Sequence, residues 1–199
     1  GDVYKRQLLC QGMVNKSAPF CETCSVTLSV DHWGSPCPHC DSPLGERSAK
    51  MSKSLGNTVS PEQMIEQFGA DTVRLFILFA ANPTAGMDWS DLAVEANHRV
   101  MQQLQTMPDM LLGWDKPAHS IDAWMLARLR QRLQQWSDAM DRYDLRRAVE
   151  CSHYDMVKDI NWYVRRGGGS AHVGRELLDA WTHMICLLYT SPSPRDSFR

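Results

Sequence analysis

Several features that define other protein classes are missing from this chain of 199 residues. No apolar run approaches the roughly 20 residues of a membrane-spanning helix, and no stretch resembles a signal peptide. The charges nearly cancel, because 21 lysines and arginines accompany 23 acidic residues. A generally basic nucleic-acid-binding surface is therefore not indicated, although a local patch stays compatible with this balance. We expect a cytoplasmic protein that does not bind membranes.

The chain also has no internal repeat and no low-complexity segment. Its hydrophobic fraction of 43% is enough for a packed core, and its length suits one or two domains. The two ends, residues 1–7 and 187–199, resemble translated adapter sequence and share no pattern with their neighbours. We therefore expect residues 8–186 to be an internal part of a longer protein, and we leave both ends out of the fold prediction.

Cysteine occurs seven times, an odd number that does not suit a disulfide framework. Four cysteines form two C-x2-C pairs separated by twelve residues: Cys21, Cys24, Cys37 and Cys40. Four thiolates on two tight turns suit a closed tetrahedral Zn²⁺ site with a structural role, which predicts a zinc ribbon over residues 21–44. His32 and His39 are alternative ligands that the spacing favours less, and an iron–sulfur cluster is a less favoured alternative to zinc.

The run Lys50-Met51-Ser52-Lys53-Ser54 follows this module and precedes a Gly-Asn turn. Two lysines on flexible stems, with serine hydroxyls beside them, suit a reaction that builds negative charge on phosphate oxygens. A short motif of this kind also occurs by chance as a solvated loop, so its context decides its meaning.

Helix signals follow the loop. Ser60, Pro61 and Gln63 form a capping signal for a helix that Gly69 can end. Asp71 is the predicted cap of a second helix, which is apolar on nearly every side and should be buried.

A third helix is expected over about residues 90–107, and Pro108, Gly113 and Pro117 mark a joint after it. Ser120 is the predicted cap of the next helix. Apolar residues recur from there at helical spacing in three stretches: Ile121, Met125, Leu129, Leu133, Trp136, Met140; Leu145, Val149, Ser152, Met156, Ile160, Tyr163; and Leu177, Leu178, Trp181, Met184, Ile185. Three amphipathic helices with short connections predict an antiparallel helical bundle over residues 118–186 in a mainly α chain.

The whole stretch 50–76 is similar to the second ATP-binding motif of the class I aminoacyl-tRNA synthetases and the helices behind it. Further stretches narrow the resemblance to the leucyl-tRNA synthetases: 8–14 (LLCQGMV), 88–91 (DWSD), 94–99 (VEANHR) and 161–168 (NWYVRRGG), the last nearer to the archaeal form. The resemblance covers most of residues 8–185.

The resemblance implies the end of a Rossmann-type catalytic domain over residues 8–20 and 45–107, followed by an anticodon-binding bundle. It implies that the parent enzyme joins leucine and ATP into leucyl-adenylate and transfers leucine to tRNA(Leu), with Mg²⁺ accompanying ATP and a monomeric parent. Lys53 and Lys50 would be catalytic, and Met51, Ser52 and Ser54 would bind ATP.

The resemblance also assigns tRNA contacts to Trp162, Arg165 and Arg166, with Tyr163 beside them, through stacking and phosphate pairing. The residues alone favour core packing for Trp124 and Trp136, and core packing stays open for Trp162 and Tyr163. The charges of the bundle alone favour an ordinary solvated surface.

Two departures from the family limit the prediction. The upstream His-x-Gly-His motif and an editing domain are absent from the sequence, so the fragment alone should not make aminoacyl-adenylate. Four cysteines before the lysine loop are not a general feature of the family. The alternatives are a non-catalytic zinc-ribbon RNA-binding protein and a class I ligase for another amino acid such as methionine.

Overall fold

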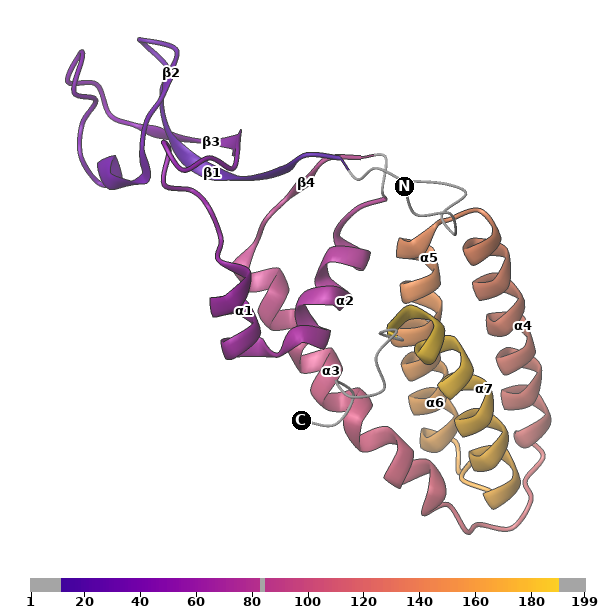
Figure 1. Cartoon of the computed structure of the whole chain (residues 1–199). Helices are drawn as coiled ribbons and strands as arrows, with labels where there is room; N and C mark the ends of the chain where they lie inside the picture. Colours follow the sequence, from indigo (N-terminus) through magenta and orange to yellow (C-terminus); the bar gives the residue numbers. More distant parts are fainter. Residues whose placement is uncertain (1–11, 83–84, 190–199) are drawn as a thin grey trace.

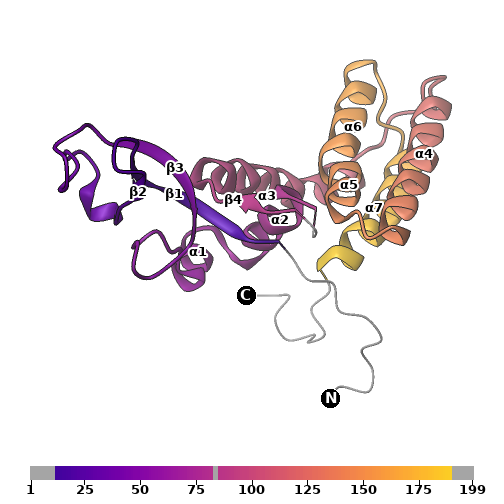
Figure 2. The same cartoon turned by 90° about the horizontal axis from the view of Figure 1, so that it is seen from above.

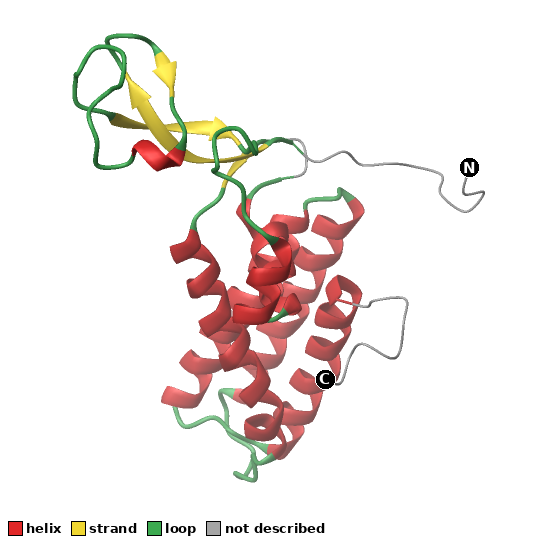
Figure 3. Cartoon of the chain, turned by 60° about the vertical axis from the view of Figure 1, so that its left-hand side comes forward, coloured by secondary structure: helices red, strands yellow, loops and turns green. Residues whose placement is uncertain are grey.

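The computed structural model of the chain describes residues 12–82 and 85–189. A small sheet lies at one end of the molecule and helices form the rest (Figure 3). The mainly helical fold that the sequence predicted is confirmed. No helix among the described residues has the length and apolar character needed to cross a membrane.

The sheet is built on strand β1 (Val14–Cys21). It pairs antiparallel with β3 (Gly45–Lys50) from Asn15 opposite Lys50 to Phe20 opposite Gly45. The short strand β2 (Val26–Thr27) pairs with the far end of β1, and β4 (Met87–Asp88) pairs in parallel with its beginning. The long β1–β3 pairing therefore brings the start of the lysine loop back beside the start of β1.

Helix α1 (Pro61–Phe68) begins where the capping signal predicted, because Ser60 accepts a hydrogen bond from the backbone of Gln63. Gly69 ends α1 at a φ of 83°, a region that favours glycine. Helix α2 (Ala70–Ala80) starts at once, with Gly69 as its N-cap. The prediction that Asp71 caps α2 is wrong, since the helix begins at Ala70, before Asp71, and Asp71 lies in its first turn. The predicted burial of α2 holds for its inner face: Thr72, Val73, Leu75 and Phe76.

Helix α3 (Asp91–Leu112) is longer than predicted. It begins about where it was predicted, with Ser90 as its N-cap, but it continues through Pro108 instead of stopping before it. A proline inside a helix removes one hydrogen bond and costs about 3 kcal/mol. Leu104, Met107 and Leu111 are buried on one face across that position, and burying such side chains contributes about 1.5–3 kcal/mol each. Packing on both sides of Pro108 therefore outweighs the cost.

Helices α4 (Asp122–Asp141), α5 (Leu145–Val149), α6 (Met156–Arg165) and α7 (Ala171–Tyr189) lie beside one another (Figure 1). Ser120 does not cap α4, because Ile121 is its N-cap and makes no side-chain cap bond. A six-residue π-helix, η2 (Glu150–Asp155), joins α5 to α6 where the sequence predicted one continuous helix. Helix α7 continues through residues 187–189, the start of the predicted foreign end; residues 1–7 and 190–199 lie outside the described part.

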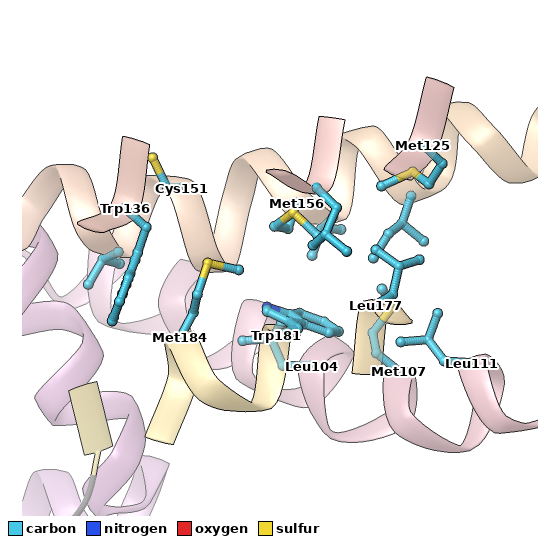
Figure 4. Packing of buried hydrophobic residues seen from close by; sticks show 14 of the residues in the cluster. Leu104, Met107, Leu111, Met125, Trp136, Cys151, Met156, Leu177, Trp181 and Met184 are labelled. Atoms are coloured by element: carbon cyan, nitrogen blue, oxygen red, sulfur yellow. The ribbon is translucent and has the colours of Figure 1, made fainter. Parts of the chain in front are cut away.

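The main core joins α3 to these helices. Trp181 and Met184 of α7 lie between Leu104 of α3 and the side chains of η2 and α6, among them Met156 (Figure 4). The predicted helical faces are confirmed by this packing. A second cluster lies between α2, β4 and α3, and a third lies inside the cysteine module. Helix α3 thus spans the distance between the sheet end and the helical end of the molecule (Figure 2).

Candidate functional site

The lysine loop leaves the sheet at the end of β3 and lies on the surface. The side chains of Lys50, Lys53 and Ser54 are exposed, and those of Met51 and Ser52 are half-buried. Both cations are therefore available to an anionic ligand, and they lie three positions apart in the chain.

Ser52 shapes the loop from within. Its hydroxyl lies 3.2 Å from that of Ser54 and accepts a hydrogen bond of 3.3 Å from the backbone of Leu55. The left-handed conformation of Gly56 (φ 67°) closes the turn, and its amide donates to the carbonyl of Lys53. The serine predicted to meet ATP thus also holds the loop in its present shape.

Asn57, only 2% exposed, fixes the loop to the sheet. Its Oδ1 accepts from the backbone of Ser52 at 2.9 Å. Its Nδ2 faces the carbonyls of Lys16 (3.1 Å), Ala49 (3.4 Å) and Lys50 (3.5 Å). The sequence showed only a Gly-Asn turn here, and nothing in its local pattern signalled that the asparagine side chain is buried.

The stretch 88–91, which carried part of the resemblance, contacts both β1 and β3. Asp88 accepts a hydrogen bond from Ser48 of β3. The backbone of Trp89 donates to Asn15 at 2.7 Å, and Asp91 pairs with Lys16 at 3.3 Å. Segments 14–16, 45–57 and 88–91 therefore meet at the base of the lysine loop.

The four cysteines of the two predicted pairs converge. Their Sγ atoms all lie within 4.8 Å of one another, and Cys21 and Cys37 are buried. Among residues 12–82 and 85–189 this is the one group of cysteine, histidine and acidic residues that can hold a metal ion. His32 and His39 do not belong to it, so the sulfur set that the spacing favoured is the one the fold assembles.

The surroundings of the thiols favour a cation. Hydrogen bonds from the side chain and backbone of Ser42 lower the pKa of Cys40 to about 6, whereas the hydrogen bond with Cys40 raises the pKa of Cys24 to about 12. One thiolate is stabilised at neutral pH while its neighbours resist ionising beside it. A soft divalent cation would remove that resistance by accepting all four thiolates.

The predicted tRNA contacts lie at the far end of the molecule, on α6 and the turn after it. Trp162 is half-buried: its ring packs at a tilt against the ring of Trp124, with 3.9 Å between centroids, and the guanidinium of Arg166 lies 3.7 Å from its centroid. Arg165 is exposed, whereas Tyr163 is fully buried and belongs to the core. The arginines face solvent, and the Trp162 ring packs against Trp124 and Arg166.

Other arginines of the helical end are engaged in ion pairs. Arg132 lies 2.8 Å from both Asp155 and Asp159, and Arg128 lies 3.1 Å from Asp159. Arg147 lies 3.3 Å from Asp155. These pairs connect α4 with η2 and α6, and α5 with η2, so their charges stabilise the packing of helices.

The comparisons with known proteins match the lysine-loop region directly. The profile of the family described as "tRNA synthetases class I (I, L, M and V)" matches residues 44–90. That range contains β3, the lysine loop, α1, α2 and β4.

Individual relatives extend the match. The leucine–tRNA ligase of Archaeoglobus fulgidus is 32% identical over 138 residues, which cover 68% of this chain and 14% of the relative. The leucine–tRNA ligase of Ruthia magnifica is 64% identical over 56 residues, covering 28% of this chain and 7% of the relative. The chain therefore spans only a small part of the curated relatives that it matches.

A solved structure has a similar fold. It is the agnB2 LeuRS of Agrobacterium radiobacter K84 in a ternary complex with tRNA and LeuAMS. The match has a TM-score of 0.51 and 22% identity, and it covers 72% of this chain and 21% of that one. Methionine as the amino acid and a non-catalytic RNA-binding role are not favoured by these relatives.

Proposed function

The chain belongs to the leucyl-tRNA synthetases of class I, and on that premise we propose that it forms the lysine-loop region of a leucine–tRNA ligase. The parent enzyme would activate leucine with ATP to leucyl-adenylate and transfer leucine to tRNA(Leu). The observation that carries the proposal is the exposed pair Lys50 and Lys53 at the end of β3, inside the stretch that matches the family.

In this proposal Lys53 stabilises the charge that develops on the α-phosphate when leucine's carboxylate attacks ATP, and Lys50 assists. Met51, Ser52 and Ser54 lie where a loop closing on the triphosphate would contact it, with Mg²⁺ accompanying ATP. Lysine ammonium groups contact the phosphate more strongly as its negative charge develops. Such contacts lower the reaction barrier more than they strengthen binding of the ground state. The segments 12–20 and 45–107 would be the end of the Rossmann-type domain, so the fragment alone would not complete an ATP site.

We assign a structural Zn²⁺ to Cys21, Cys24, Cys37 and Cys40. The four convergent sulfurs fit the ion, and a filled tetrahedron has no position open for a substrate. The ribbon, residues 21–44, contains only a small apolar cluster. Metal binding would supply its folding energy, as in other small zinc modules.

The helices over residues 118–186 would form the anticodon-binding part. Arg165 and Arg166 would pair with tRNA phosphates, and Trp162 would hold Arg166 in place through the contact between its ring and the guanidinium. The LeuRS with the similar fold is solved with tRNA and LeuAMS, which supports tRNA as a partner of the parent. A monomeric parent and a cytoplasmic location stay predictions.

The test is Lys53→Ala in the intact enzyme that contains this chain. ATP–pyrophosphate exchange should slow by about 10²–10³-fold, the typical cost of removing one group that stabilises transition-state charge. Leucine binding should change little, because the lysine acts on phosphate. Lys158→Ala, on the exposed face of α6, is the matched control and should keep full exchange activity. Full activity in Lys53→Ala would refute the role assigned to that residue.

A further inference from the structure

The cysteine module and the lysine loop touch each other at a second place, away from the strand that joins them. The backbone N–H of Val30 donates to the carbonyl of Leu55 at 2.9 Å. A Cβ on Gly56 would lie 2.9 Å from Cγ2 of Val30 and 3.7 Å from Oγ of Ser29. The end of the lysine loop is thus packed directly against the ribbon.

Val30 lies within the module that the four cysteines close. It lies between the two cysteine pairs, two residues after Leu28, which is buried with Cys21 and Cys37. The Leu28 amide donates to Pro19 of β1 at 2.8 Å. A cluster this small has too little apolar surface to keep its shape alone, so the position of Val30 depends on the sulfur site.

The start of the loop depends on the same site. Cys37 and Cys40 form the second turn of the module, which is closed by hydrogen bonds from Cys37 to Ser42 and from Asp41 to Cys37, each 2.9 Å long. Strand β3 begins five residues after Cys40 and ends at Lys50. One end of the lysine loop therefore follows the module closely in the chain, and the other end contacts the module at Val30.

We propose that metal binding by the four cysteines positions the lysine loop, through the contact of Ser29 and Val30 with Leu55 and Gly56. Without metal, the Val30–Leu55 bond is lost and the loop opens. The consequence for ATP rests on the proposed function, whereas the coupling between metal and loop does not.

Trypsin reports the coupling in the full chain, because it cleaves after Lys50 and Lys53 only when the loop opens. Adding one equivalent of Zn²⁺ to the chelator-treated chain should slow cleavage at these lysines by about five- to tenfold, as expected when one net hydrogen bond holds the loop closed. Cleavage after Arg165 and Arg166 should not change and serves as the internal reference. Equal cleavage of the loop with and without Zn²⁺ would overturn the proposal.

Gly56→Ala tests the contact with Val30 separately from metal binding, because it disrupts the contact and leaves the four cysteines in place. The added methyl group meets Val30 at 2.9 Å, so the metal-loaded variant should be cleaved as fast as the metal-free chain while still binding one Zn²⁺ by native mass spectrometry.

Gly34→Ala is the matched control, since Gly34 also has a positive φ (77°) but no atom lies within 4 Å of the new methyl group. It should keep the metal-dependent protection. Protection retained in Gly56→Ala, or lost in Gly34→Ala, would contradict the assigned contact. The assay contains no ATP, so its outcome is independent of the Lys53→Ala test.

Discussion

At the scale of single residues, Asn57 shows how one buried amide can set the shape of an exposed loop. Its amide group joins β1, β3 and the lysine loop through hydrogen bonds to four backbone groups. The lysines that would do the chemistry have no comparable constraint, since their side chains are exposed. The conformation of the loop therefore depends on a residue that does not face the ligand.

Asn57→Asp should destabilise the loop. The substitution conserves shape but replaces an N–H donor with an oxygen that faces three carbonyls, which costs about 1–3 kcal/mol for unsatisfied buried groups and more for a charge. We expect a lower free energy of unfolding and faster tryptic cleavage after Lys50 and Lys53.

Asn97→Asp is the control for this change. Asn97 is also buried, but it bonds Ala93 and Tyr154 in the helical part. It should lower stability without increasing cleavage in the lysine loop. Equal cleavage of the loop in both variants would show that Asn57 has no special role there.

At the scale of elements, the π-helix η2 changes which side chains face the core between α5 and α6. The extra residue in its wide turn brings three consecutive residues, Cys151, Ser152 and His153, into buried positions. His153 is 1% exposed, and its Nδ1 lies 2.7 Å from the Ser152 hydroxyl. Burial lowers the pKa of His153 to about 4.

This pKa predicts acid sensitivity of the helical core. The folded state keeps His153 neutral, whereas the unfolded chain binds a proton near pH 6.5. The free energy of unfolding is therefore unaffected by His153 above about pH 6.5. As the pH falls toward 4, proton binding by the unfolded chain lowers it by a total of about 3 kcal/mol. The free energy of unfolding, measured by urea titration from pH 7 to 4, should fall less steeply in His153→Gln than in the unmodified chain.

His172→Gln provides the comparison, because His172 lies on the exposed side of α7. Because this variant keeps His153, the fall in stability between pH 7 and 4 should persist. If His153→Gln and the unmodified chain had the same slope, the buried histidine would not be the source of the acid sensitivity.

At the scale of the whole molecule, the ribbon and the helices have separate cores. The ribbon core consists of three buried residues with three partly buried neighbours, four of these six being the metal-binding cysteines. The core around α3 to α7 is much larger and contains no residue of the ribbon. The sheet also lies away from helices α4 to α7 (Figures 1 and 2).

The chain should therefore unfold in two steps, only one of which depends on metal. Chelation should remove the ribbon transition in calorimetry and leave the helical transition in place, because the helical core has no metal ligand among its buried residues. Native mass spectrometry should find one Zn²⁺ in the full chain.

Two cysteine variants check this assignment. Cys24→Ser removes a ligand and should abolish stoichiometric Zn²⁺ binding together with the ribbon transition. Cys151→Ala, in the buried part of η2, should keep both while lowering the helical transition. Unchanged Zn²⁺ binding in Cys24→Ser would show that the metal is held elsewhere.

Local signals in the sequence were enough to predict that the four cysteines gather in one module, that Ser60 caps α1, and which helical faces around Trp136 and Trp181 are buried. Each signal is a cap or a regular spacing within one stretch of chain, where spacing fixes much of the geometry. The resemblance over residues 50–76 pointed to the family in the same way, through a contiguous motif.

Only the tertiary structure decided the rest, because it depends on contacts between distant segments. Asn57 is buried against Lys16, 41 residues away, and Val30 meets Leu55 across the loop. The Trp162 ring packs against Trp124 of another helix. Helix α3 continues past Pro108 because it packs against α7, although proline disfavours the interior of a helix. The sequence by itself determined which chemical groups are present. The fold determined which of them are exposed to a ligand and which are taken up by contacts within the protein.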